Sequence, residues 1–126
     1  MKITMNCTQH PATPEQIAQG VVDLPVEDRE MVCGWLTIDE LPTAEDLWVR
    51  ADMIASHLET LPGVHPGARV MIGGAPYLMG HLERALRAVG LVPVYAFSRR
   101  ESVETQLPDG SVKKSNVFRH IGFVEV

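Results

Sequence analysis

Three short segments of this chain carry groups that could contact an anion or move a proton. The first is Thr8-Gln9-His10, which places a hydroxyl, an amide and an imidazole after a predicted short strand over residues 2–6 that ends in Asn6. The second is Gly73-Gly74, with Tyr77 shortly after it, and the third is Ser98-Arg99-Arg100. These residue types suit a phosphate-bearing ligand, because hydroxyls, amides, free backbone N–H groups and guanidinium groups all donate hydrogen bonds to phosphate oxygens.

In the first segment, His10 is the candidate catalytic residue, because imidazole can transfer a proton near neutral pH. Asn6, Thr8 and Gln9 could bind phosphate or the edges of a nucleobase. The alternative is a purely structural loop in which Asn6 or Thr8 caps backbone groups.

In the second segment, two glycines remove side chains where the backbone could approach a ligand, and the helix expected after Pro76 would offer free N–H groups to an anion. A simple strand-to-helix turn is the alternative. Tyr77 could stack on a base, or it could have a role in the core or at an interface. Arg99 and Arg100 could clamp a phosphate. Alternatively, Arg100 and Glu101 could be strand-surface charges that pair across the hairpin.

Other catalytic templates are missing from the sequence. The five histidines show no metal-ligand spacing such as HxxxH, the two cysteines (Cys7 and Cys33) form no CxxC pair, and no GxSxG motif occurs. Cys7 remains either a buried small thiol or a reactive one with a base nearby. The sequence therefore predicts neither a metal centre nor a bound cofactor.

The elements that must position these groups alternate between strand and helix. The segment from Arg69 to Phe97 runs as strand, tight turn, helix, Gly stop and strand, which predicts a βαβ unit. Hydrophobic spacing predicts further strands at residues 2–6 and 21–25, helices after Thr13, from Val26 to Trp35 and after Thr43, and a β-hairpin over 102–118 with a turn at Pro108-Asp109-Gly110. We therefore expect one α/β domain over residues 1–126, a Rossmann-like three-layer sandwich with a mostly parallel sheet and a C-terminal β-hairpin. In such sheets the three polar segments would meet at the C-terminal ends of the strands.

Composition narrows the function classes. The chain has 126 residues and a net charge of −5, which argues against binding to a nucleic-acid duplex. No apolar run is long enough for a membrane span, and no signal peptide is visible, so we expect a cytoplasmic protein that does not bind membranes. The charge is uneven: residues 15–59 carry a net −9, whereas residues 99–126 carry a net +1.

Several segments resemble one family of small, uncharacterised proteins of bacteria and their phages: Thr8–Gln16, Gly73–Pro76, Tyr95–Glu101 and Val117–Phe123. A strand followed by His-Pro-x-Thr-Pro-Glu-Gln, with a central strand–helix unit, is also similar to CRISPR-associated Rossmann-like (CARF-like) proteins, including ring nucleases. This second resemblance implies a dimer that binds a cyclic oligoadenylate and cleaves it by attack of a ribose 2′-hydroxyl.

These observations predict a protein that binds a nucleotide or another small anionic ligand, with possible cleavage of a cyclic oligonucleotide. One alternative is a non-catalytic protein-binding module, such as a phage-encoded modulator of a host protein. A third is an enzyme that acts on a small metabolite through Cys7 or His10. Homodimerisation is compatible with all three.

Overall fold

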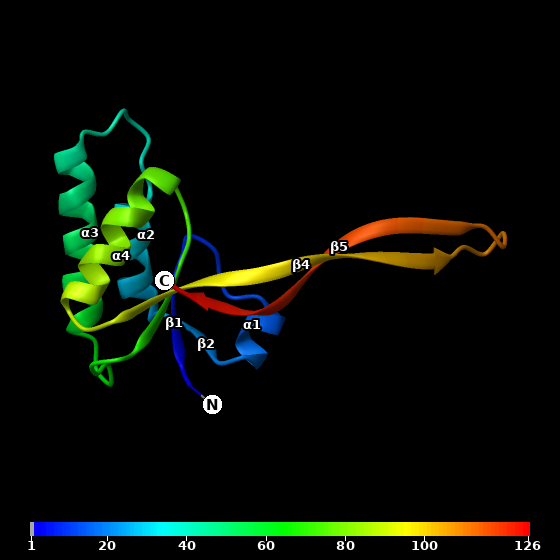
Figure 1. Ribbon diagram of the computed structural model, residues 1–126, viewed down its shortest axis with the longest axis horizontal. Coiled ribbons are helices and arrows are strands. Elements are labelled where there is room, and N and C mark those ends of the chain that lie inside the picture. Colours follow the sequence, from blue (N-terminus) through cyan, green and yellow to red (C-terminus); the bar gives the residue numbers. More distant parts are fainter. Residues whose placement is uncertain (1) are drawn as a thin grey trace.

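Five strands form one mixed sheet in the order β2-β1-β3-β4-β5. The computed structural model describes residues 2–126; Met1, the first residue of the expected domain, lies outside them. The strands, shown in Figure 1, are β1 (Thr4–Cys7), β2 (Val21–Asp23), β3 (Arg69–Ile72), β4 (Val92–Gln106) and β5 (Val112–Glu125).

The strands that follow β1 along the chain are added to both of its edges. β2 pairs with β1 on one side and β3 pairs with β1 on the other, and both pairings are parallel. β4 then adds to β3 in parallel, whereas β5 pairs antiparallel with β4. The boundary between β1 and β3 is therefore a topological switch point, where connections leave toward opposite sides and open a crevice at the carboxyl ends of the strands.

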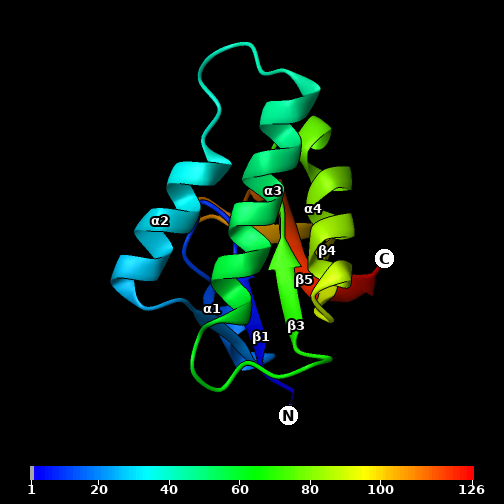
Figure 2. The ribbon, with the colours of Figure 1, turned by 90° about the vertical axis from the view of Figure 1, so that its left-hand side faces the viewer.

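The helices are α1 (Pro14–Ala18), α2 (Val26–Leu36), α3 (Ala44–Glu59) and α4 (Pro76–Ala88). Thr13 and Thr43 start α1 and α3 with reciprocal capping boxes. Helices α2, α3 and α4 lie together on one face of the sheet (Figure 2), where they bury the main core. The largest fully buried side chains of α3 and α4 are all aliphatic: Ile54, Leu58, Leu78, Leu82 and Leu86.

The second face of the sheet carries far less structure. Val21, Met71 and Val94 form a small cluster there, with Phe123 of β5 packed against it. The connection from β1 to β2 is short and has room only for the five residues of α1. The α/β class is confirmed. The pairings β1–β2, β1–β3 and β3–β4 are parallel as expected, and the sheet is mixed because β5 of the hairpin runs antiparallel. The Rossmann-like three-layer sandwich is not confirmed, because in the described chain the second face carries only the short helix α1.

A long two-stranded arm projects from the sheet (Figure 1). β4 and β5 stay paired from Val94 and Glu125 out to Gln106 and Val112, with an irregularity between Phe97 and Ser98. The predicted hairpin and its turn are confirmed. The predicted end of the strand at Phe97 is wrong, because no glycine or proline interrupts β4 between Phe97 and Leu107 and each residue finds a partner on β5.

In the part of the chain that the structure describes, no helix combines the length and the apolar character needed to cross a bilayer.

Candidate functional site

An open cleft of about 430 Å³ lies at the carboxyl ends of β1 and β3, which is the switch point of the sheet. One wall is the loop after β1, including Thr8, Gln9 and His10, and the opposite wall is the Gly73-Gly74 turn after β3. The remaining lining comes from Pro11, Thr13, Gln16, Met71, Ile72, Tyr95 and Ala96. Two of the three polar segments identified in the sequence are thus brought together.

Asn6 lies beneath the loop and does not line the cleft. Its side chain is almost fully buried, and its Nδ2 donates to the His10 carbonyl and to Asp23 Oδ1, both at 2.8 Å. Its Oδ1 accepts from the Thr8 amide at 3.1 Å and from the Thr8 hydroxyl at 2.7 Å. Both polar atoms of Asn6 are occupied within the protein, so this residue positions the loop and has little capacity left for a ligand.

Asp23 extends this support from the neighbouring strand. The Asn6 amide and the Ala12 backbone N–H, which lies 3.0 Å away, both donate to its carboxylate. The hydrogen bond from Asn6, more than that from Ala12, holds the pKa of Asp23 below its usual range. The loop after β1 is therefore pinned to both β1 and β2.

The upper part of the loop presents different groups. Gln9 donates through Nε2 to the Thr37 hydroxyl at 3.0 Å, which links the loop to the end of α2. His10 is exposed and follows directly, so its imidazole is open to a molecule in the cleft.

The opposite wall is built from backbone. A side chain on Gly73 would meet Thr8 Cγ2 at 3.7 Å, so the two walls approach each other here. Gly74 has φ +148°, a conformation that favours glycine. Helix α4 begins just beyond, after Ala75, with no capping side-chain hydrogen bond and no acidic residue in its first turn. This end of α4 is electrostatically suited to an anion.

Tyr95 forms a third part of the lining that sequence reasoning missed. Its hydroxyl donates to Glu83 Oε2 of α4 at 2.6 Å. Burial, together with this carboxylate, raises the pKa of Tyr95 well above its ordinary value, so the phenol stays protonated and fixed. Its only sequence signal is its position two residues before the predicted strand end.

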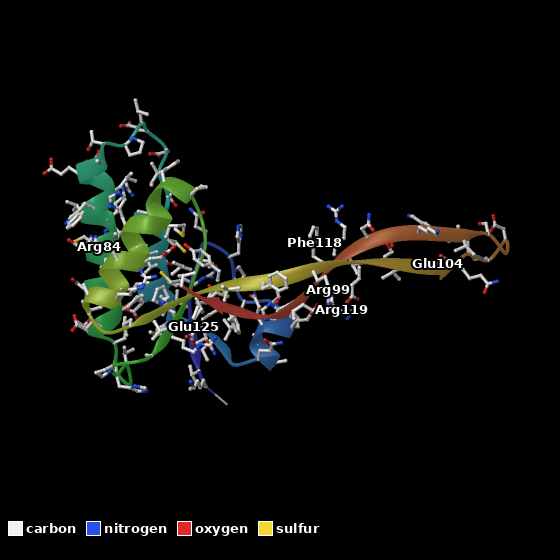
Figure 3. All side chains as sticks on the ribbon, viewed as in Figure 1. Arg84, Arg99, Glu104, Phe118, Arg119 and Glu125 are labelled. Carbon is white, nitrogen blue, oxygen red and sulfur yellow. The ribbon has the colours of Figure 1, made fainter. Side chains whose placement is uncertain are left out.

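The third predicted segment lies elsewhere. Ser98, Arg99 and Arg100 are exposed residues inside β4, on the arm, and do not line the cleft. Arg99 lies 3.5 Å from Glu101 of the same strand, and the Arg100 guanidinium lies 5.4 Å from the centre of the Phe118 ring of β5. Arg99 and Phe118 are labelled on the arm in Figure 3. The ion pair across the hairpin joins Glu101 to Arg119 at 2.8 Å, whereas Arg100 contacts a ring there. Tyr77, in the first turn of α4, is exposed and also lies outside the cleft lining.

Cys7 lies at the end of β1 but is completely buried in the main core. Burial, and to a smaller extent the neighbouring Cys33, raises the pKa of the Cys7 thiol to about 12. A thiol in this state is a poor nucleophile at neutral pH.

Comparison with known proteins places the chain in a family. The model of the family described as "Uncharacterized protein MJ1673 family" matches residues 2–124. The chain belongs to this family. Membership in the MJ1673 family agrees with the expected uncharacterised family spanning nearly the whole chain, and it carries no link to phages or to CARF-like proteins. No curated protein and no solved structure matches the chain significantly.

Proposed function

We propose that this MJ1673-family protein binds a small phosphate-bearing ligand of the nucleotide class in the cleft at the β1–β3 switch point. The observation that carries the proposal is the meeting of the Thr8–His10 loop and the Gly73-Gly74 turn across one cleft at the carboxyl ends of parallel strands. This is the place where open α/β sheets, including Rossmann-like ones, hold their ligands.

The chemistry of the cleft supports a ligand with a phosphate at one end and an apolar sugar or base at the other. The Gly73-Gly74 turn suits the phosphate, because its backbone lines the cleft without side chains. The start of α4 follows just outside this lining and adds partial positive charge with no acidic side chain in its first turn. Pro11 and Ala96 give the cleft apolar surface for a sugar or a base. A volume of about 430 Å³ lies in the range of small-molecule sites.

His10 is the proposed proton-transfer group. For a cyclic oligonucleotide, the ribose 2′-hydroxyl would attack the adjacent phosphorus, the bond to the 5′-oxygen would break, and the products would be a 2′,3′-cyclic phosphate and a 5′-hydroxyl. The imidazole of His10 would take the 2′-proton or deliver a proton to the leaving oxygen. The proposed cleavage uses the same cleft as the proposed binding, and it assumes that the protein is cytoplasmic.

Calorimetric titration with a panel of compounds tests the binding proposal. The panel contains inorganic phosphate, AMP, ATP, a linear diadenylate, a cyclic oligoadenylate, and adenosine as the compound without phosphate. We expect saturable binding of at least one phosphorylated compound and none of adenosine. Chromatography of the mixtures would detect cleavage.

Two variants localise the binding. Gly73→Val would push a side chain toward Thr8 and should weaken binding by about tenfold or more, equal to about 1.4 kcal/mol. His65→Ala is a control for a surface change outside the cleft lining and should leave binding unchanged. Absence of binding across the panel, or binding that Gly73→Val leaves unchanged, would contradict the proposal.

A further inference from the structure

The arm formed by Ser98–Gln106 of β4, the turn, and Val112–His120 of β5 has no partner within the described chain. It extends away from the sheet and all four helices (Figure 1). Beyond its root at His120, which contacts Glu15 and Gln19 of the α1 region, the side-chain hydrogen bonds of the arm join arm residues to one another.

A ribbon of two strands is at best marginally stable alone in water, because neither face is covered. The arm nevertheless exposes four large apolar side chains: Leu107, Val112, Val117 and Phe118, the last at 68%. Contact of these residues with another surface would be favourable, since each Å² of apolar area removed from water stabilises the contact by about 25 cal/mol.

The charge of the arm indicates what kind of surface could cover its apolar side chains. Residues 98–120 hold five basic side chains against three acidic ones, whereas residues 26–59 hold nine acidic side chains against Arg29 and Arg50. The arm is thus the positive part of a negative molecule, and its electrostatic complement is the α2–α3 region of the same sequence.

That region has a groove with matching character. A hollow of about 610 Å³ lies between the end of α2 and the start of α3. Its lining includes the acidic residues Asp39, Glu40 and Glu45 and the exposed apolar residues Leu41 and Val49, of which Leu41 is 97% exposed. The groove offers both the charge and the apolar contact that the arm requires.

The arm does not reach the groove of its own chain. Helices α2 and α3 lie on one side of the sheet and the arm points away from the other side (Figures 1 and 2). We propose that the arm of one copy docks on the α2–α3 groove of a second copy. A two-fold axis would then repeat the contact, with each copy supplying one arm and one groove.

Sedimentation equilibrium of the full chain over a concentration series tests this proposal. We expect a dimer that dissociates on dilution. Lys113→Glu reverses a charge on the arm and should raise the dimer dissociation constant by about tenfold. Lys2→Glu makes the same charge change at a residue that belongs neither to the arm nor to the lining of the groove, and should leave the constant unchanged.

The groove is tested from the other side with Glu40→Lys/Glu45→Lys, which should weaken the dimer to a similar degree. Combining these changes with Lys113→Glu restores opposite charges and should recover part of the affinity. A shortened chain in which Asn-Gly replaces residues 103–115 should be monomeric. Circular dichroism of each variant checks that it is folded.

A wild-type chain that stays monomeric throughout the series would overturn the proposal, even if the arm proved to capture a different protein. A dimer that tolerates Lys113→Glu or the shortened arm would overturn it as well. Loss of affinity in both charge variants without any recovery in the combination would overturn the contact between arm and groove.

Discussion

One buried amide, that of Asn6, fixes the first wall of the cleft. Its four hydrogen bonds join the loop to two strands. Asn6→Ala removes one of the two donors to Asp23 and one of the two donors to the His10 carbonyl, and should lower the free energy of unfolding by about 2–3 kcal/mol. Urea denaturation measures this. Asn116→Ala, on the exposed arm, is the control and should cost less than about 0.5 kcal/mol; equal effects would contradict the role of Asn6.

The same network predicts a pH dependence. The pKa of Asp23 is lower in the folded chain than in the unfolded chain, because Asn6 and Ala12 donate to the carboxylate. The unfolded state therefore binds the proton first as the pH falls, so this stabilisation is complete above the ordinary aspartate pKa of about 3.9 and is lost below it. Urea unfolding at a series of acidic pH values should show a shallower loss of stability for Asp23→Asn than for wild type. Parallel curves would contradict this assignment.

Cys7 illustrates why position along the chain is a weak guide to reactivity. It follows a strand, as a nucleophile might, but it is buried and its pKa is raised to about 12. Iodoacetamide at neutral pH should modify the partly exposed Cys33 well before Cys7, as measured by mass spectrometry of peptides. In denaturant both should react. Fast modification of Cys7 in the folded chain would contradict the burial argument.

At the scale of elements, the turn between β3 and α4 is the most constrained part of the site. Gly74 has a positive φ that an alanine adopts only with strain, so Gly74→Ala should destabilise the fold by about 1 kcal/mol or more. Gly80→Ala is the matched control: this residue is exposed inside α4 with open space at its Cβ position, and alanine should stabilise the helix by about 0.5–1 kcal/mol. Thermal unfolding of the two variants compares them; a shift of the same sign in both would contradict the assignment.

The elements also show what the sequence alone could predict. The sequence alone predicts that the Thr8–His10 loop and the Gly73-Gly74 turn lie close together. Both segments follow strands expected to be parallel, and the carboxyl ends of parallel strands meet at the same edge of a sheet. Arg99 and Arg100 could not be placed correctly, because the sequence around them is compatible both with a loop after a strand that ends at Phe97 and with a strand that continues into a two-stranded ribbon. Their pairing with Arg119 and Phe118 of β5 decides for the ribbon.

The distribution of helices between the two faces of the sheet could not be predicted from the sequence. Hydrophobic spacing predicts where helices occur along the chain, but it does not say which face of the sheet each helix covers. The short β1–β2 connection leaves α1 alone on one face, and the end of β5 covers part of the rest through Phe123.

At the scale of the whole molecule, the chain divides into a body that holds both apolar clusters and an arm that holds almost none of the core. Replacement of residues 103–115 by Asn-Gly should therefore leave the unfolding free energy of the isolated copy within about 1 kcal/mol of wild type, since surface changes away from the core cost little. Chemical denaturation at high dilution measures this. A much larger loss would show that the arm stabilises its own chain.

Amide chemical-shift mapping by NMR is the most direct test of the proposed binding of a phosphate group in the β1–β3 cleft. The titrant is the phosphorylated compound that binds most tightly in the panel. We expect saturable shifts concentrated at Gln9, His10, Gly73, Gly74 and Ala75. Shifts confined to the arm or to the α2–α3 groove, or no saturable shifts from any phosphorylated compound in the panel, would contradict it.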